Sequence, residues 1–290
     1  MSLANIFAFK NDLKKTSANK ADAVNIIRHA ILTGIKMYKM KYGRMYGDVV
    51  IACDGRQYWR RSLFPYYKAG RSEQREKSDL DWTLVFDTID TIRRDLAEHF
   101  PYKVIHLDHV EADDIIGALC KWTQTNGLVD YGVFEDKQPV MIISSDGDFK
   151  QLHKYPNVKQ WSPIQKKIVT CDDPIRYLAA HIAKAGDDGI PNVLSEDNVF
   201  VTDNVRQTKM TSLRLDEFVE RGRDACRNDT ERRNWDRNNQ LINLDLIPPE
   251  ISTSIIDTYV GTKPKGDKMS VYRYLVNNNC RLLLNDIEEF

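Results

Sequence analysis

Apolar residues at three- and four-residue spacing mark the first predicted helix, between residues 24 and 40. This spacing places them on one face of a helix. Two further helices are predicted at 82–99 and 111–127. The second opens with acidic residues and closes on Gly127, which are typical helix start and stop signals.

Short apolar runs lie between these helices and predict strands. The runs are DVVIAC (48–53), YKVIHL (102–107) and MIISS (141–145). Alternation of strands and helices predicts a mostly parallel sheet with helices on both faces. A small hairpin is predicted from KQW and KKIVT (159–170).

The pattern changes near residue 184. Asp173 and Pro174 form an N-cap and first-turn pair for a helix that runs to about Lys184. From AGDDGIPNV (185–193) onward the chain reads as helices and polar loops. We therefore predict an α/β domain over 1–184 and a smaller helical domain over 185–290.

Composition limits the class of protein. The 290 residues are 42% hydrophobic, enough for a sizeable core, and no apolar run approaches the roughly 20 residues of a membrane span. Five scattered cysteines without a C-x-x-C pair indicate neither a zinc site nor a disulfide framework, and favour a reducing cytoplasm. Lys plus Arg equals Asp plus Glu, at 42 each, so only local charge segregation is informative.

One segment is strongly basic. RQYWRRSLFPYYKAGRSEQREK (56–77) holds seven Lys or Arg against two Glu, interleaved with five aromatic residues. Lys and Arg bind phosphates, and Tyr and Trp rings can stack on bases, so this composition favours a nucleic-acid contact. The alternative is a solvated amphipathic helix.

Acidic residues follow three successive predicted strands. Parallel strands bring such positions to one edge of a sheet, where ligands bind. So many like charges require cations, and oxygen ligands suit Mg²⁺ or Mn²⁺. Acids at a helix start are also favourable for dipole reasons alone, and Asp114 and Asp187 are the weakest members. The full set is Asp54, Glu111, Asp113, Asp114, Asp146, Asp148, Asp187 and Asp188.

Several of these blocks together resemble one family. With CDG (53–55), YWRRSLFPYYKAGR (58–71), EADD (111–114), SSDGDFKQLHKYPNVKQWSP (144–163) and GDDGIPNV (186–193), the chain resembles the 5′ nuclease, or flap endonuclease, superfamily, and within it the ribonucleases H of T-even-type bacteriophages. The resemblance implies a PIN-like 5′ nuclease fold with a helical arch at about 56–80. It also implies a helix-hairpin-helix-like DNA-binding element in the C-terminal domain.

The resemblance also implies a function and residue roles. Members remove RNA primers and 5′ flaps in lagging-strand replication, as Mg²⁺-dependent 5′ to 3′ exonucleases and flap endonucleases. Ala185 stands where the family has another acid, so Asp188 is preferred to Asp187. The implied catalytic residues are Lys68 and Arg60; the metal ligands are Asp54, Glu111, Asp113, Asp146, Asp148 and Asp188; and the nucleic-acid contacts are Tyr67, Arg71, Arg75, Gly189 and Ile190.

The implied surroundings are those of a replication nuclease. Two Mg²⁺ ions are expected, with Mn²⁺ as a substitute, and the substrates are branched or 5′-flapped DNA and RNA–DNA hybrid. A monomer in the bacterial host cytoplasm, with a single-stranded-DNA-binding protein as partner, is also implied.

The start of the chain departs from the family pattern. MSLANIFAF (1–9) resembles the part after the family's first strand, so that strand and its Asp are expected to be missing. The alternative function is therefore a truncated, catalytically impaired module that binds branched DNA.

Overall fold

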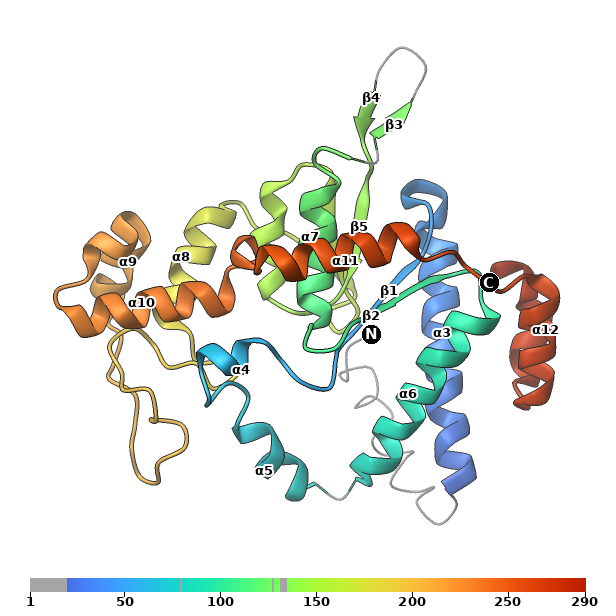
Figure 1. Cartoon of the computed structure of the whole chain (residues 1–290), viewed down its shortest axis with the longest axis horizontal. Helices are drawn as coiled ribbons and strands as arrows, with labels where there is room; N and C mark the ends of the chain where they lie inside the picture. Colours follow the sequence, from blue (N-terminus) through green and yellow to red (C-terminus); the bar gives the residue numbers. More distant parts are fainter. Residues whose placement is uncertain (1–19, 79, 127, 131–134) are drawn as a thin grey trace.

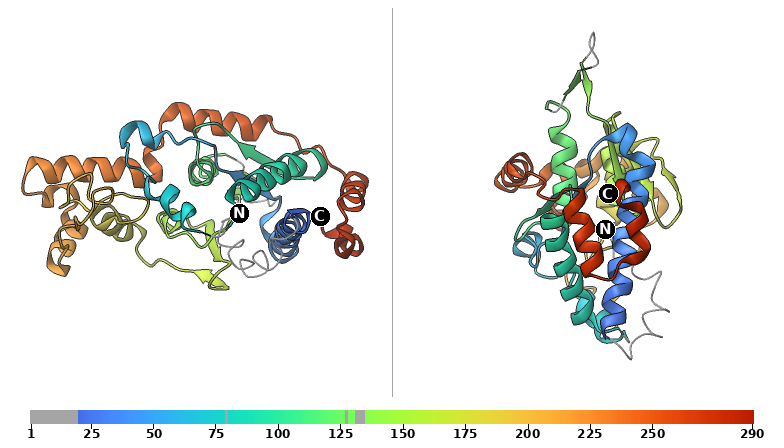
Figure 2. Two further views of the ribbon diagram at one scale, coloured as in Figure 1. Left: turned by 90° about the horizontal axis from the view of Figure 1, so that it is seen from below. Right: turned by 90° about the vertical axis from the view of Figure 1, so that its right-hand side faces the viewer.

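A computed structural model describes residues 20–290, apart from 79, 127 and 131–134. The prediction that the family's first strand is missing concerns the start of the chain, which lies outside the described residues. The molecule is elongated, with α9 and α10 at one end and α3 and α12 at the other (Figures 1 and 2). Within the described residues, no helix combines the length and apolar character needed to cross a bilayer.

The predicted strands form, and they pair in parallel. Strand β1 (Val50–Cys53) pairs with β2 (Lys103–His106), and β5 (Val140–Ile143) pairs with β6 (Val158–Ser162). The hairpin prediction is confirmed, because β6 continues antiparallel into β7 (Lys167–Val169). Hydrogen bonds among the described strands leave β1–β2 and β5–β7 as separate groups. A further hairpin, β3 (Leu128–Asp130) with β4 (Glu135–Lys137), projects at the top of Figure 1.

Helices cover both sides of these strands. Helices α3 (Lys20–Tyr46) and α6 (Trp82–His99) pack on one side and α7 (Ala112–Trp122) on the other, whereas α8 (Pro174–Lys184) packs against the turn after β5. Helix α8 starts as predicted, because the Asp173 side chain accepts a hydrogen bond from the Arg176 N–H at 2.9 Å and Pro174 occupies the first turn.

The predicted end of the helix at Gly127 is wrong. Helix α7 ends at Trp122, since two side chains compete for the carbonyl that a further turn would use. The Thr123 hydroxyl and the Gln124 amide both donate to the Cys120 carbonyl, at 2.9 and 2.8 Å. Local side-chain bonds of this kind favour helix ends.

The basic segment is not one solvated helix. It forms two short helices, α4 (Arg60–Leu63) and α5 (Gly70–Glu76), joined by a stretch that contains Pro65. Phe64 and Tyr67 in that stretch are 2% and 4% exposed, so the segment is anchored in the core. It lies below the sheet in Figure 1.

The C-terminal third is helical, as predicted. It contains α9 (Ser212–Arg221), α10 (Asp229–Ile242), α11 (Pro249–Gly261) and α12 (Lys268–Asn277). Short 3₁₀ turns complete the structure; they are Asp148–Lys154, Gly222–Ala225, Leu244–Leu246 and Arg281–Glu289.

Four apolar clusters form the core, and each mixes residues from before and after residue 184. In the first, α3 and α6 pack against residues 271–290. In the second, the segment between α4 and α5 packs with α8, α9 and α10. The third cluster includes Leu244 and Ile247. The fourth includes Ile255 of α11, which lies beneath α7. The two parts of the chain therefore fold as one unit.

This packing gives a prediction for α12. Leu275 is fully buried in the first cluster, so Leu275→Ala should lower the free energy of unfolding by about 2–5 kcal/mol. Leu282 is 83% exposed, and Leu282→Ala should change it by less than about 0.5 kcal/mol. Urea unfolding followed by tryptophan fluorescence measures both values; equal effects would contradict the packing.

Candidate active site

The acids after β1 and β2 meet at one edge of the sheet. Because the two strands are parallel, Asp54 after β1 and Glu111 after β2 lie at the same end. The Asp54 carboxylate accepts a hydrogen bond from the Ala112 N–H, at 2.9 Å. The end of β1 is thereby joined to the first turn of α7, which carries Asp113.

The acids after β5 are held by a tight turn. The Asp148 N–H donates to the Asp146 carboxylate at 2.9 Å, and Gly147 lies between them. A Cβ at Gly147 would lie 2.8 Å from the Tyr177 hydroxyl, so a larger residue there would displace the Tyr177 side chain. The SDGD turn is therefore shaped by α8 as well as by the strand.

The acids from the two strand groups lie within electrostatic reach of each other. Burial raises the pKa of Asp113 well above its ordinary value, and the charges of Asp146, Asp148 and Asp54 raise it further. Burial and the charge of Asp148 likewise raise the pKa of Asp146. Mutual repulsion of this kind identifies a site that attracts cations.

The basic segment supplies cations to the same place. Lys68 is buried and forms ion pairs with Glu111 and, at 3.3 Å, with Asp188. Arg71 pairs with the other oxygen of Asp188 at 2.5 Å. Burial lowers the pKa of Lys68, but the Glu111 and Asp188 carboxylates raise it more, so the ammonium stays charged.

Backbone contacts fix the basic segment against the GDDGIPN turn. The Lys68 N–H donates to the Asp188 carbonyl at 2.7 Å, and both residues have left-handed backbones, with φ of 56° and 53°. Gly189, with φ of 76°, would place a Cβ 2.9 Å from the Tyr66 carbonyl. Non-glycine residues with positive φ cost free energy and cluster at functional sites.

Three predicted residues are more buried than their expected roles suggest. Tyr67 is 4% exposed and its hydroxyl donates to Glu111 at 3.1 Å, so a base reaches its ring only if the segment moves. Arg60 is 3% exposed, among carboxylates. Ile190 is 4% exposed, which leaves its backbone to make any contact. Arg75 lies over the Phe86 ring at 4.9 Å.

Two of the weaker acid candidates separate from the rest. Asp114 is fully buried and accepts hydrogen bonds from Arg60 and from Trp59, so it faces α4. Asp187 is exposed, beyond α8, but its charge acts on His181 together with those of Asp148 and Asp146. The structure thus groups Glu111 and Asp188 around Lys68, and Asp54, Asp113, Asp146 and Asp148 beside them.

Sequence reasoning missed His181 on α8. Its Nε2 contacts the Asp148 carboxylate at 2.8 Å, and its ring stacks on Tyr177, with centroids 5.9 Å apart. Burial lowers the pKa of His181, but the bond to Asp148 and the nearby acids raise it more. The four-residue spacing of Tyr177 and His181 on one helix face was the available signal.

The acids suit hard divalent cations; in this structure Glu111 and Asp188 pair with Lys68 or Arg71, whereas Asp54 and Asp146 accept from backbone N–H groups. Among the described residues, no three acidic, histidine or cysteine side chains lie close enough to hold one ion as they stand. Instead, Lys68 and Arg71 partly neutralise the charges of the Glu111 and Asp188 carboxylates. Oxygen donors with raised pKa values fit Mg²⁺ or Mn²⁺.

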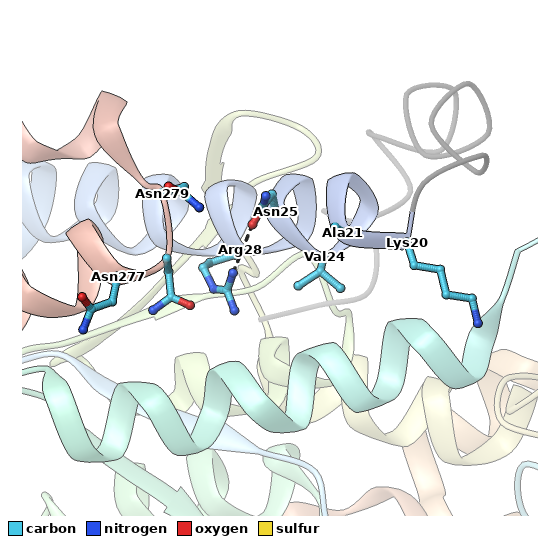
Figure 3. A pocket seen from close by; sticks show the side chains of 8 residues that line it. Lys20, Ala21, Val24, Asn25, Arg28, Asn277 and Asn279 are labelled. Atoms are coloured by element: carbon cyan, nitrogen blue, oxygen red, sulfur yellow. Dashed lines mark hydrogen bonds between the residues drawn. The ribbon is translucent and has the colours of Figure 1, made fainter.

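A shallow pocket elsewhere on the molecule is unrelated to these acids. It has a volume of about 370 Å³ and lies between the first turns of α3 and the residues that follow α12 (Figure 3). Its lining includes Arg28, which donates to Asn25 and Tyr274 within the protein. It is therefore a packing feature at the far end of the molecule.

Two family models together match most of the chain. Residues 4–184 match the family model for the 5′-3′ exonuclease N-terminal resolvase-like domain, and residues 183–290 match that for the T4 RNase H C-terminal region. The chain is 33% identical to the ribonuclease H of Enterobacteria phage T4, over 92% of this chain and 87% of that protein.

More distant relatives match as well. The flap endonuclease Xni of Shewanella halifaxensis is 31% identical over 47% of this chain and 49% of its own length. The zinc-bound T5 5′-exonuclease superposes with a TM-score of 0.48 at 17% identity, covering 92% of this chain and 94% of that one. The extent of the family match and the identity to the phage enzyme show that the chain belongs to the 5′-3′ exonuclease family and is a 5′ nuclease.

Proposed function

We propose that this 5′ nuclease is a Mg²⁺-dependent 5′ to 3′ exonuclease and flap endonuclease that removes RNA primers and 5′ flaps during lagging-strand replication. The observation that carries the proposal is the meeting of mutually repelling acids with Lys68 and Arg71 of the basic segment. Acids that attract cations and side chains that bind phosphate are the two requirements for phosphodiester hydrolysis.

The divalent cations would be held by carboxylates from four places in the chain. When bound, a pair of such ions activates water and stabilises the leaving oxygen. The residues that would hold them are Asp54, Glu111, Asp113, Asp146, Asp148 and Asp188. Mn²⁺ should substitute for Mg²⁺, because both prefer oxygen ligands.

Lys68 and Arg71 would hold the scissile phosphate. Both already contact anionic oxygens at the rim of the acid cluster, so a phosphate oxygen can replace a carboxylate oxygen without new geometry. The charge of Lys68 would then stabilise the negative charge that develops at phosphorus. Arg71 is about half-exposed and can reach the strand from outside.

The GDDGIPN turn and the helices after it would bind the duplex. Gly186 and Gly189 have positive φ, and the backbone of Gly189 lies against that of Tyr66 and Lys68. We propose a nuclease domain over 1–184 and a DNA-binding domain over 185–290, although the core packing is continuous. Branched DNA and RNA–DNA hybrid as substrates, a single-stranded-DNA-binding protein as partner, and a monomer in the host cytoplasm complete the proposal.

The second candidate is a module that binds branched DNA without cutting it. The contacts of Lys68 and Arg71 with the acids favour it if they persist when DNA binds. A cleavage assay on a 5′-flap substrate, with and without Mg²⁺, separates the candidates. Cleavage that requires Mg²⁺ supports the nuclease, whereas binding alone supports the module.

The first prediction concerns the metal ligands. Asp146→Asn or Asp148→Asn should abolish Mg²⁺-dependent flap cleavage and leave DNA binding largely intact, because each removes a ligand charge but little volume. Gel-shift and cleavage assays on the same substrate measure both. Cleavage retained in both variants would contradict the assignment of Asp146 and Asp148 as metal ligands.

The second prediction concerns repulsion among the acids. Because the pKa of Asp113 is raised, its ionised form opposes folding, and Asp113→Asn should raise the melting temperature in EDTA at neutral pH. The gain should shrink as pH falls through the raised pKa towards the unfolded value of about 3.9.

Asp197 provides the matched control for this experiment. It pairs with Arg237 and, at 2.7 Å, with Arg233, so its charge should support folding. Asp197→Asn should lower the melting temperature at neutral pH. If both variants shift it in the same direction, the acids of the site do not repel one another as argued.

The third prediction concerns phosphate contacts. Lys68→Ala and Arg71→Ala should each reduce the log–log salt slope of single-strand binding by about 0.7 to 0.9, one phosphate contact apiece. Lys121→Ala is the control, because Lys121 is exposed in the last turn of α7, at the end of that helix opposite the acids. Unchanged slopes for Lys68→Ala and Arg71→Ala would show that this segment does not bind phosphates.

A further inference from the structure

Arg60 at the start of α4 has no free face to offer a substrate. Its side chain is 4% exposed, and its guanidinium makes four hydrogen bonds within the protein. The Nε group donates to the Leu241 carbonyl at 2.7 Å, at the end of α10. The two Nη groups donate to the carboxylates of Asp114 and Glu111.

Asp114 is the main counter-charge of Arg60. The two form a bidentate pair, with Nη2 to Oδ1 at 2.7 Å and Nη1 to Oδ2 at 3.0 Å. Asp114 also accepts from the Trp59 indole N–H at 2.9 Å and from the Glu111 N–H at 3.1 Å. All of its acceptor capacity is therefore used inside the protein.

The same guanidinium fixes one oxygen of Glu111. Arg60 Nη1 lies 2.8 Å from Glu111 Oε2, whereas Lys68 contacts Oε1. The Tyr67 hydroxyl lies 3.1 Å from both oxygens. With Oε2 anchored to Arg60, Oε1 is the oxygen that contacts Lys68, which also pairs with Asp188.

We propose that Arg60 and Asp114 are a positioning pair, which orients Glu111 so that its Oε1 is presented to the cation site. This inference rests on the proposed function, since it takes Glu111 as a cation ligand. Residues behind a metal ligand typically change metal affinity or activity about 10- to 100-fold when they are altered. Arg60 thus acts through Glu111, without touching the scissile phosphate.

The pair also joins three distant parts of the chain. Arg60 belongs to the basic segment, Glu111 and Asp114 to the first turn of α7, and Leu241 to the end of α10, which lie together at the lower left of Figure 1. Lysine cannot replace this geometry, because an ammonium lacks the planar fork that bonds both carboxylates. The test is therefore a conservative change at position 60.

The experiment compares Arg60→Lys with Arg214→Lys in the full chain. Arg214 is the matched control, because it is also buried and pairs with two carboxylates, Glu217 and Glu231, both at 2.5 Å. Mn²⁺ binding is measured by electron paramagnetic resonance, melting temperature by calorimetry, and kcat and KM on a 5′-flap substrate.

Arg60→Lys should weaken Mn²⁺ binding about tenfold or more and lower kcat by about 10- to 100-fold, with KM changed less than about threefold. Arg214→Lys should lower the melting temperature and leave Mn²⁺ affinity unchanged. The inference is overturned if Arg60→Lys loses only stability, as the control does.

A second variant keeps the test decisive if Arg60→Lys does not fold. Asp114→Asn preserves shape and can still accept from Trp59, but it leaves the whole Arg60 charge to Glu111. Mn²⁺ binding should weaken, because Arg60 then pairs with Glu111 alone and competes more strongly with Mn²⁺ for that carboxylate. Unchanged Mn²⁺ affinity would refute the inference. Failure of the proposed function would look different, since the wild-type chain itself would then bind no Mn²⁺ and cut no flap.

Discussion

Repulsion among carboxylates at one edge of the sheet is the constraint on which the arrangement of the surrounding elements depends. The raised pKa values of Asp113 and Asp146 show that the fold brings negative charge together at a cost in stability. Positive groups come from elements far apart in the chain: Lys68 and Arg71 from the basic segment, and His181 from α8. The first turn of α7 adds the favourable end of a helix dipole beside Asp113.

The core reflects the same requirement. To bring Lys68 and Arg71 to the acids, the basic segment must be anchored at a point where it leaves the sheet. Phe64 and Tyr67 supply that anchor by packing with α8, α9 and α10 in the second apolar cluster. Lys68 and Arg71 are thus held in place by α8, α9 and α10 as much as by the sheet. This anchor explains why residues from before and after residue 184 share the second cluster.

Much of this architecture could be predicted from local patterns. Strand ends, the Asp173 cap and the acids beyond each strand follow from periodicity and from residue type. Contacts across long separations could not be predicted, because no period links Arg60 to Asp114, 54 residues away, or Asp148 to His181. The end of α7 was misplaced because side-chain bonds to the Cys120 carbonyl ended it before Gly127. Composition favoured a nucleic-acid contact for 56–77 and left a solvated helix as the alternative, whereas burial of Phe64 and Tyr67 makes the segment part of the core.

The first cluster combines residues from the two ends of the described chain, and this has a consequence for folding during translation. Helices α3 and α6 leave the ribosome early, but their apolar faces are covered by residues 271–290, which are synthesised long after them. The nascent chain must therefore carry an exposed apolar surface through most of its synthesis, a condition that invites chaperone binding. Since the same late residues complete the packing around α3 and α6, a ribosome that stalls before α12 would release a chain whose first cluster is incomplete.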